Sequence, residues 1–318
     1  MNRCPITYID SGSARYSQPG LRLLSPRLNH LENFPYSAAE QRRQAILQAG
    51  KISIQGVQPK LSARLSIVDE IFEIVDKDGR YILKPQHADY PELPENEDLS
   101  MKLAGLVGIT TPLHGLIYSS DDSMTYFIKR FDRAGQKDKL AVQDFATLTG
   151  KDRETKYDSS IERLLQALDY CTFPLVEAVE FYRRLLFNYL IGNEDMHLKN
   201  WSLITTHGKT ELTPAYDYLS TTVAFRALGI PANEIEETAL PLSGKKKKLT
   251  RELWIDYLAG ERLQLNKRVI NGILSDFAGT ISKWEHLISR SFLTRELQGL
   301  YCEIIQSRLS VLDVLKEA

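Results

Sequence analysis

Three side chains in the middle of the chain have the types and the order needed to transfer a phosphoryl group. Asp195 is followed five residues later by Asn200, and Asp217 follows after a further short segment. Phosphoryl transfer uses an aspartate that accepts the proton of the acceptor hydroxyl, and an amide and a second carboxylate that hold Mg²⁺ against the ATP phosphates. The spacing predicts these roles for Asp195, Asn200 and Asp217. Because such a spacing also occurs by chance in solvated loops, the prediction depends on the rest of the chain.

The segment between Asn200 and Asp217 is predicted to be a β-hairpin. Residues 201–204 and 211–213 have strand-like patterns, and they flank a turn at 206–209. Such a hairpin would return Asp217 to the side of Asn200.

A helix is predicted directly before Asp195. Pro174 suits its first position, apolar residues recur on one face, and Gly192 suits its end. A buried helix would hold Asp195 rigidly enough to work. No second histidine or cysteine stands at metal-ligand spacing, so His197 is not expected to bind a metal. We expect it instead to support the loop or to approach the nucleotide. Lys199 could offer positive charge to the transferred phosphoryl group.

The earlier part of the chain supplies a candidate phosphate contact. Residues 71–75 and 80–84 are predicted strands, joined as a hairpin through an Asp-Gly turn. Lys84 ends the second strand, where a kinase places a lysine against the nucleotide phosphates. An edge-strand lysine with no such role is the alternative. Glu97 lies in the first turn of the next predicted helix and is placed to pair with Lys84.

A loop of small and polar residues precedes these strands, at residues 51–60. Backbone N–H groups in such a loop can bind phosphate, although an ordinary β-turn is the alternative.

The chain is predicted to divide into two lobes. Strand patterns at residues 113–118 and 124–131 are followed by a polar and helical composition. We therefore expect an α+β, bilobal, protein-kinase-like fold, with a β-rich N-terminal lobe at 1–132 and a mostly helical C-terminal lobe at 133–318. The strand before this boundary would be the hinge.

The composition excludes several classes of protein. The 318 residues are 43% hydrophobic and 25% charged, with a net charge of −1, so no overall positive field would attract nucleic acid or an anionic membrane. No apolar run is long enough for a membrane helix, and the N-terminus lacks the apolar core of a secretory signal. Three isolated cysteines predict neither disulfides nor a zinc site. The lysines at 245–248 could indicate nucleic-acid binding, but without interleaved aromatic residues they are interpreted as a solvated loop. Contact with an acidic protein substrate is a further alternative.

Taken together, these stretches resemble the HipA-type serine/threonine kinases, the toxins of bacterial toxin–antitoxin systems. The matching stretches follow the order of the family and are residues 53–60, 81–85, 96–97, 130–133, 156–158, 195–200 and 213–217.

The resemblance implies an ATP- and Mg²⁺-dependent protein kinase whose protein substrate could be an aminoacyl-tRNA synthetase. By position, the loop residues Gln55, Gly56, Val57, Gln58 and Lys60 would cover the ATP phosphates. The backbone of Lys129 and Phe131 would meet the adenine, and Ser53 would be the site of autophosphorylation. About 50 residues precede Ser53, fewer than in HipA itself, so the chain resembles the short, HipT-like branch. Gln55 stands where some short members carry a second serine, which argues against two-site autophosphorylation.

These features lead to expectations about partners and location. We expect a small companion or antitoxin protein, no direct nucleic-acid partner, no membrane, and a cytoplasmic location, with export by a route without a classical signal left open. A small-molecule or lipid kinase and a catalytically silent binding module are the alternative functions.

Overall fold

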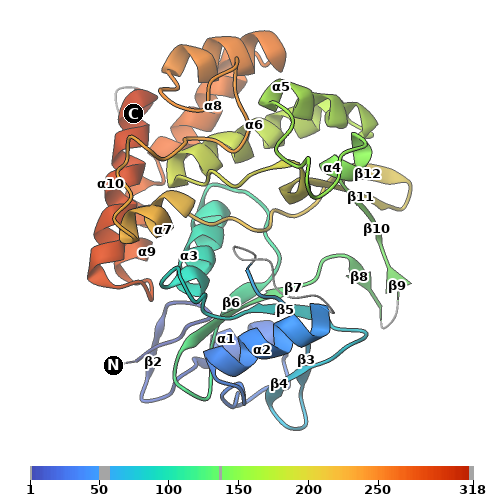
Figure 1. Cartoon of the computed structure of the whole chain (residues 1–318), viewed down its shortest axis with the longest axis vertical. Helices are drawn as coiled ribbons and strands as arrows, with labels where there is room; N and C mark the ends of the chain where they lie inside the picture. Colours follow the sequence, from blue (N-terminus) through green and yellow to red (C-terminus); the bar gives the residue numbers. More distant parts are fainter. Residues whose placement is uncertain (1, 50–57, 136–137, 315–318) are drawn as a thin grey trace. The chain divides into compact units, whose positions relative to one another are not determined.

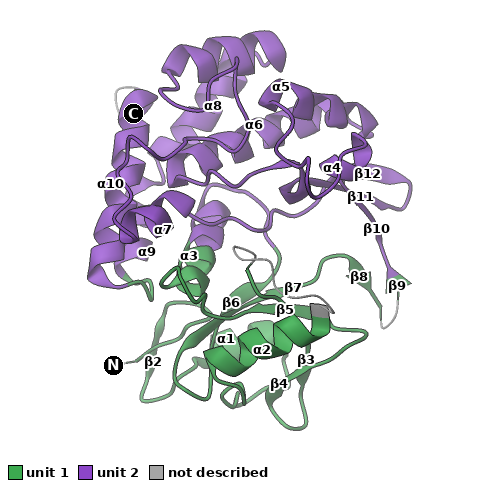
Figure 2. Ribbon diagram, viewed as in Figure 1, with its two compact units in different colours: residues 1–99, 112–138, 290–293 green, residues 100–111, 139–289, 294–318 purple. Residues whose placement is uncertain are grey.

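The chain, as a computed structural model, is described for residues 2–49, 58–135 and 138–314. It divides into two compact units (Figure 2). The first unit contains residues 1–99, 112–138 and 290–293. The second unit contains residues 100–111, 139–289 and 294–318. The boundary that the sequence suggests after residue 132 stays a prediction.

The first unit is built on a five-stranded antiparallel sheet with the strand order β4-β3-β5-β7-β6. Its strands are β3 Leu61–Ser66, β4 Ile71–Ile74, β5 Tyr81–Lys84, β6 His114–Tyr118 and β7 Met124–Lys129. The predicted hairpin between β4 and β5 is wrong, because both strands pair with β3, which lies between them. This order pairs both edges of β3, whereas a β4–β5 hairpin would leave one of them open.

Three helices accompany this sheet along the chain (Figure 1). They are α1 Gln18–Leu24, α2 Ala38–Ala49 and α3 Leu93–Leu106, the last of which continues into the second unit. Helix α2 begins with a capping box, in which the Glu40 N–H donates to Ser37 Oγ (3.3 Å) and Glu40 Oε2 accepts from the Ser37 N–H (2.8 Å). Short strand pairs also occur, namely β1 Asn2–Arg3 with β2 Asp10–Gly12 and β8 Arg133–Ala134 with β9 Asp138–Lys139.

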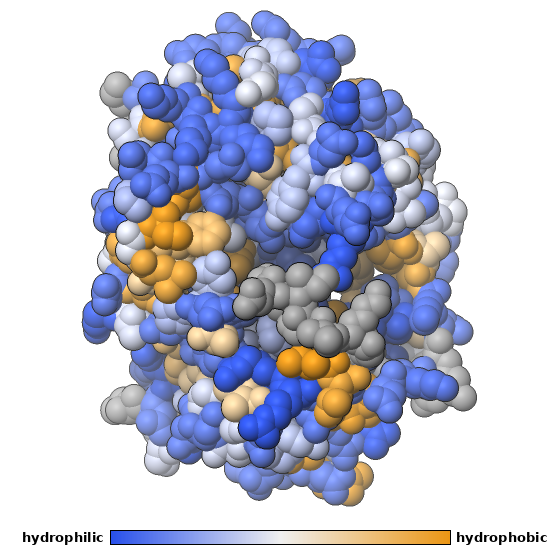
Figure 3. All heavy atoms as spheres, viewed as in Figure 1, coloured by the Kyte–Doolittle hydropathy of each residue, from blue (hydrophilic) through white to orange (hydrophobic). Residues whose placement is uncertain are grey.

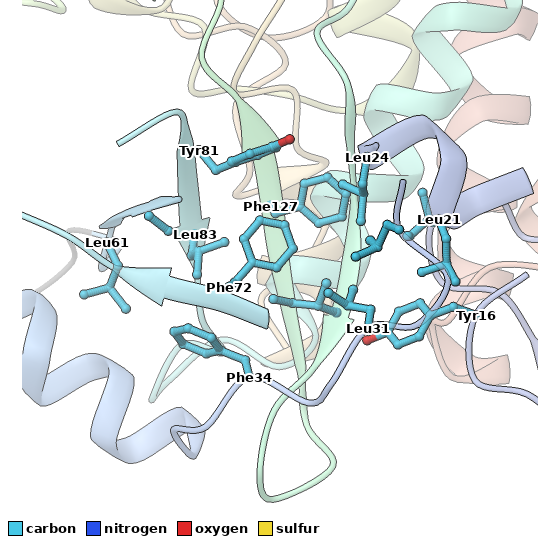
Figure 4. Packing of buried hydrophobic residues seen from close by; sticks show 14 of the residues in the cluster. Tyr16, Leu21, Leu24, Leu31, Phe34, Leu61, Phe72, Tyr81, Leu83 and Phe127 are labelled. Carbon is cyan, nitrogen blue, oxygen red and sulfur yellow. The ribbon is translucent and has the colours of Figure 1, made fainter. Parts of the chain in front are cut away.

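One face of the sheet carries the hydrophobic core of the first unit (Figure 4). Phe72 lies at its centre, with its ring centroid 5.1 Å from that of Tyr81 and 5.5 Å from that of Phe127. Successive side chains of a strand point to opposite faces. Leu83 therefore enters this core, while its neighbour Lys84 points to the opposite face. The alternation along β5 thus delivers a lysine to the site described below.

The second unit is mostly helical (Figure 1). Its helices are α4 Phe145–Leu148, α5 Ile161–Leu164, η1 Leu165–Tyr170, α6 Pro174–Ile191, η2 Leu198–Asn200, α7 Thr221–Ala227, η3 Leu253–Arg262, α8 Lys267–Ala278, α9 Ile281–Ser289 and α10 Arg295–Val311. The predicted helix before Asp195 is confirmed as α6, with Pro174 first and Gly192 as its left-handed cap. Most of α6 is buried, as a rigid support requires.

A small sheet completes the second unit. Its strands are β10 Ala141–Asp144, β11 Ser202–Thr206 and β12 Lys209–Leu212, and they pair in that order. The predicted hairpin is confirmed, because Leu203 pairs with Leu212 and Thr206 with Lys209. The third strand, β10, was not predicted, since its pairing with β11 joins segments about 60 residues apart.

In the view of Figure 3 most of the visible face is hydrophilic, and its hydrophobic side chains gather in separate patches. Across the described residues, no helix combines the length and the apolar character needed to cross a bilayer.

Candidate active site

The first unit contributes a buried ion pair between Lys84 and Glu97. Lys84 Nζ lies 2.5 Å from Glu97 Oε1, and the two side chains are 2% and 1% exposed. Lys84 also lies over the ring of Tyr126, the residue opposite it on β7. Removing two charges from water is costly, and such a pair does not stabilise a fold more than apolar side chains of the same size would. The sequence predicts that a strand lysine pairs with a helix glutamate, and this pair is present in the first unit.

Two further contacts, one part-buried and one buried, fix the first turns of α3. Gln86 Nε2 donates to both carboxyl oxygens of Glu95, at 2.8 and 2.9 Å, and His114 Nδ1 lies 2.8 Å from Asp98 Oδ1. Burial raises the pKa of Glu95 to about 8, although the bond from Gln86 acts in the opposite direction. We call these two contacts and the Lys84–Glu97 pair the α3 latch.

The predicted phosphate loop is described only at its end. Gln58 Nε2 lies 3.4 Å from Glu97 Oε2, so this residue reaches the buried ion pair. Lys60 is exposed at the start of β3. The other residues predicted for this loop lie outside the described residues, and they are Ser53, Gln55, Gly56 and Val57.

The predicted hinge lies at the end of β7. The backbone N–H of Lys129 already donates to the Leu113 carbonyl (2.8 Å), so an adenine contact at Lys129 would use its carbonyl oxygen instead. Phe131, half-buried, follows two residues later. Between them, Arg130 binds Asp132 through two hydrogen bonds, of 2.9 and 2.6 Å, which gives this turn a fixed shape.

In the second unit, the loop after α6 is anchored by backbone contacts. The Thr222 N–H donates to the Gly192 carbonyl (2.9 Å), and the Glu194 N–H donates to Thr221 Oγ1 (2.8 Å). Asn193 Oδ1 accepts from the Asp195 N–H at 3.1 Å. Gly192 has a φ of 74°, and a Cβ there would lie 2.7 Å from Thr222 Oγ1, so only glycine fits this turn. The loop therefore begins from a fixed point.

Asp195 and Asn200 are joined directly. Asn200 Nδ2 donates to the Asp195 carbonyl at 2.8 Å, and the His197 N–H donates to the same oxygen at 2.8 Å. The Asp195 side chain is 48% exposed, so its carboxylate is available to an incoming group. Since the Asn200 nitrogen is used within the loop, its oxygen is the end of the amide that suits a cation.

The hairpin returns the chain to the same loop at Tyr216 and Asp217. The Tyr216 hydroxyl donates to the Lys199 carbonyl at 3.0 Å and lies 2.6 Å from Ser202 Oγ. Asp217 has a φ of 57°, an uncommon value for a residue with a Cβ, and such conformations occur at sites where the surroundings impose them. The bond from Tyr216 to the Lys199 carbonyl therefore brings the neighbouring residue 217 back to the loop of Asn200, as the sequence predicts.

Lys156 and Tyr157, for which the sequence analysis predicts no individual role, contact this loop. The Tyr157 hydroxyl donates to Asp195 Oδ1, and Lys156 Nζ lies 2.7 Å from His197 Nε2. Burial lowers the pKa of His197, with the Asp195 carboxylate acting in the opposite direction and the Lys156 ammonium lowering it further. The stretch 156–158 was noted for its resemblance to a family, but no spacing signal connects it to a loop about 40 residues away.

Lys199 lies beside a carboxylate. Its Nζ is 3.2 Å from Asp144 Oδ2, and Asp144 also caps α4 by accepting from the Thr147 N–H at 2.7 Å. The positive charge that we expected at Lys199 is therefore partly neutralised in this arrangement.

The candidate cation ligands of the second unit are the side-chain oxygens of Asn200 and Asp217. No group of three or more His, Cys, Asp or Glu side chains is arranged to hold a metal within the described ranges. The carboxylate of Asp217 and the amide oxygen of Asn200 are hard oxygen ligands of the kind that Mg²⁺ prefers, with water and phosphate oxygens completing its shell. These residues thus fit Mg²⁺ bound together with ATP.

A separate hollow of about 750 Å³ in the second unit lies away from these residues. Its lining includes Leu106, Leu175, Val176, Val179 and Arg183, and it contains none of the residues predicted for catalysis. We therefore place the candidate chemistry at Asp195 rather than in this mostly apolar hollow.

Sequence comparisons connect the chain to kinases. A family model described as the HipA-like C-terminal domain matches residues 52–284. A Haemophilus influenzae protein whose name describes a kinase is 29% identical over 327 residues. The aligned part covers 95% of this chain and 94% of that protein. The serine/threonine-protein kinase toxin HipA of Shewanella oneidensis is 27% identical over 190 residues, which cover 54% of this chain and 43% of the toxin.

A solved structure supports the fold. The Shewanella oneidensis toxin–antitoxin complex of HipA, HipB and operator DNA aligns with a TM-score of 0.68 and 20% identity, covering 92% of this chain and 75% of that chain. The predicted α+β bilobal fold, with a β-rich N-lobe and a mostly helical C-lobe, is confirmed. The expectation of no nucleic-acid partner is partly at odds with this complex, since it contains DNA.

Proposed function

Because the chain belongs to the family of HipA-like C-terminal domains, we propose that it is an ATP-dependent protein serine/threonine kinase and the toxin of a toxin–antitoxin system. Relatives named as a kinase and as a serine/threonine-protein kinase toxin support the kinase activity. The more distant of these relatives, the Shewanella oneidensis toxin, supports specificity for serine and threonine.

The observation that carries the proposal is the buried pair of Lys84 and Glu97. Kinases require a strand lysine that binds the nucleotide phosphates and a helix glutamate that orients it. A Lys–Glu pair that is almost fully buried costs solvation free energy, so its presence needs a reason other than stability. Phosphate binding by Lys84 supplies that reason, and Gln58, which reaches Glu97, would orient the same pair.

In the proposed reaction, Asp195 accepts the proton of the acceptor hydroxyl while the oxygen of that hydroxyl attacks the γ-phosphorus of ATP. The bond from the γ-phosphorus to the bridging oxygen breaks, and ADP leaves. The contact from Asn200 to the Asp195 carbonyl holds the loop in one shape during this step. Mg²⁺, held by Asn200 and Asp217, would neutralise phosphate charge when it is bound with ATP.

The remaining contacts to ATP follow from position. The loop residues Gln55 to Lys60 would cover the phosphates, the backbone near Lys129 and Phe131 would bind the adenine, and His197 and Lys199 would lie near the nucleotide. We propose Ser53 as the site of autophosphorylation.

The substrate and partner follow from the family. We propose a component of translation, such as an aminoacyl-tRNA synthetase, as the protein substrate. The complex of HipA with HipB supports a small companion protein as antitoxin. Since this chain has a net charge of −1, a contact with DNA would fall to the companion rather than to the chain itself.

Labelled ATP tests the proposal directly. The wild-type protein should incorporate γ-phosphate at Ser53 when it is incubated with MgATP, and Asp195→Asn should not. Asp217→Ala should weaken the binding of MgATP but not the binding of ATP without metal, because Asp217 acts through the cation. Absence of phosphate transfer to any serine or threonine, with ATP bound, would overturn the proposal.

A further inference from the structure

The Tyr157 hydroxyl occupies an oxygen of the carboxylate that is proposed to accept the substrate proton. It donates a hydrogen bond to Asp195 Oδ1, and no other hydroxyl of the described ranges bonds to that carboxylate. A phenol that donates to the catalytic aspartate makes the same contact as the acceptor hydroxyl of a substrate. Tyr157 therefore fills the position that an acceptor must take.

Resting on the kinase function proposed above, we propose that Tyr157 determines specificity for the acceptor by excluding water from Asp195. While its hydroxyl holds Oδ1, water near the γ-phosphate has less access to this base, and ATP is hydrolysed slowly. A protein substrate displaces the phenol, because its bound surface holds a serine or threonine hydroxyl at the same oxygen.

The surroundings of Tyr157 suit such a displaceable group. Its side chain is held by weak contacts to its ring, with Lys156 Nζ 4.9 Å from the ring centroid and the His197 ring edge-on at 5.0 Å. The residue is 43% exposed, so the ring can leave toward solvent without opening a core. Burial and the charge of Asp195 raise the pKa of Tyr157, and the hydroxyl is therefore protonated and able to donate at neutral pH.

The reaction that Tyr157 suppresses is simple hydrolysis. The oxygen of water would bond to the γ-phosphorus, its proton would pass to Asp195, and the bond to the bridging oxygen of ADP would break. The products would be ADP and inorganic phosphate. Removing the phenol oxygen frees Oδ1 for this reaction and leaves every other group in place.

The test is the rate of ADP formation by the full chain with MgATP and no protein acceptor. Tyr157→Phe keeps the ring and both of its ring contacts and removes only the hydroxyl. Hydrolysis should rise by about tenfold or more, the effect of losing one competing hydrogen bond to a charged group, with the KM for ATP unchanged. Tyr170→Phe, an exposed tyrosine in the same unit, is the matched control and should hydrolyse ATP at the wild-type rate. Tyr157→Phe combined with Asp195→Asn should form no ADP.

The other outcomes overturn the inference. A fall in hydrolysis would make Tyr157 a support for the orientation of Asp195. An unchanged rate would mean that Oδ2 serves as the base, or that the contact has no role. If labelled phosphate still reaches Ser53 in Tyr157→Phe, these results reject only the role of Tyr157. If neither variant nor wild type forms ADP or transfers phosphate, the kinase proposal fails with it.

Discussion

The two groups of candidate residues are built in opposite ways. In the first unit, Lys84 and Glu97 are buried and bind each other, and their positions are fixed by side chains packed around them. In the second unit, the Asp195 carboxylate is half-exposed, and its position is fixed by backbone contacts of the loop that carries it. A residue of the first group should therefore affect both stability and activity, whereas Asp195 should affect activity alone.

Substitutions in the two groups should therefore affect stability and activity differently. A change of a buried charge leaves its partner unpaired in a medium of low dielectric constant, and the folded state pays for it. A change of an exposed side chain on an anchored loop removes chemistry and leaves the packing intact.

The largest expected effect is that of Asp195→Asn on phosphate transfer. The amide cannot accept the proton, so kcat should fall by about a thousandfold. The melting temperature and the affinity for ATP should stay close to the wild-type values, because the loop is held by its backbone. Labelled phosphate transfer, thermal melting and nucleotide binding measure the three quantities. A melting temperature many degrees lower would contradict the separation of chemistry from folding in this unit.

The buried pair should behave differently when one partner is lost. Lys84→Met leaves Glu97 charged and buried, so the free energy of unfolding should fall by about 3 to 5 kcal/mol, and phosphate transfer should be lost as well. Urea unfolding followed by circular dichroism measures the change.

A double variant sharpens this test. Lys84→Met with Glu97→Leu removes both charges, and most of the lost stability should return while transfer stays absent. A double variant as unstable as Lys84→Met would show that packing, and not the unpaired charge, causes the loss.

A pH dependence should arise from Glu95, whose pKa is raised to about 8 by burial. Its folded form is protonated up to that pH, whereas in the unfolded chain it ionises near pH 4.5. The stability contributed by Glu95 is therefore full below pH 4.5 and is lost as the pH rises toward 8. Glu95→Gln is neutral at every pH, so its stability relative to wild type should increase between pH 5 and pH 8 by about 2 to 4 kcal/mol. Parallel melting-temperature curves for the two proteins would refute the shift.

The smallest effect is expected for an exposed pair in the same unit. Arg64 Nε lies 2.6 Å from Glu73 Oε2 across β3 and β4, and the guanidinium is largely in solvent. Arg64→Ala should lower the free energy of unfolding by about 0.5 kcal/mol or less, since water screens the attraction. A loss as large as that of Lys84→Met would mean that burial is not what separates the two pairs.

Local signals in the sequence were sufficient to predict the helix and the hairpin on either side of the loop that carries Asp195. The spacing of Asp195 and Asn200 corresponds to a hydrogen bond within one short loop, and the hairpin that follows is set by its own turn. The helix before the loop was predicted from Pro174 and Gly192, since caps and apolar periodicity act within a few residues.

Contacts between distant segments could not be predicted in this way. The insertion of β3 between β4 and β5 overrode the hairpin signal, because strand order depends on which edges the whole sheet leaves open. Tyr157 gained its role only through a fold that brings it to Asp195, 38 positions along the chain. The pairing of Lys199 with Asp144 is non-local in the same sense.

The α3 latch has a consequence for how the activity can be controlled. A displaced helix would have to break the contacts of Glu95, Glu97 and Asp98 together. A hydrogen bond to a charged carboxylate contributes about 1.5 to 3 kcal/mol, whereas the bond to Glu95, which is protonated in the folded protein, contributes about 0.5 to 1.5 kcal/mol. The three losses sum to about 3.5 kcal/mol or more, so no more than about three molecules in a thousand would hold the displaced helix at any moment. The beginning of α3 thus keeps one position within its unit. A signal that turns the protein off should therefore act on a segment whose displacement requires less free energy.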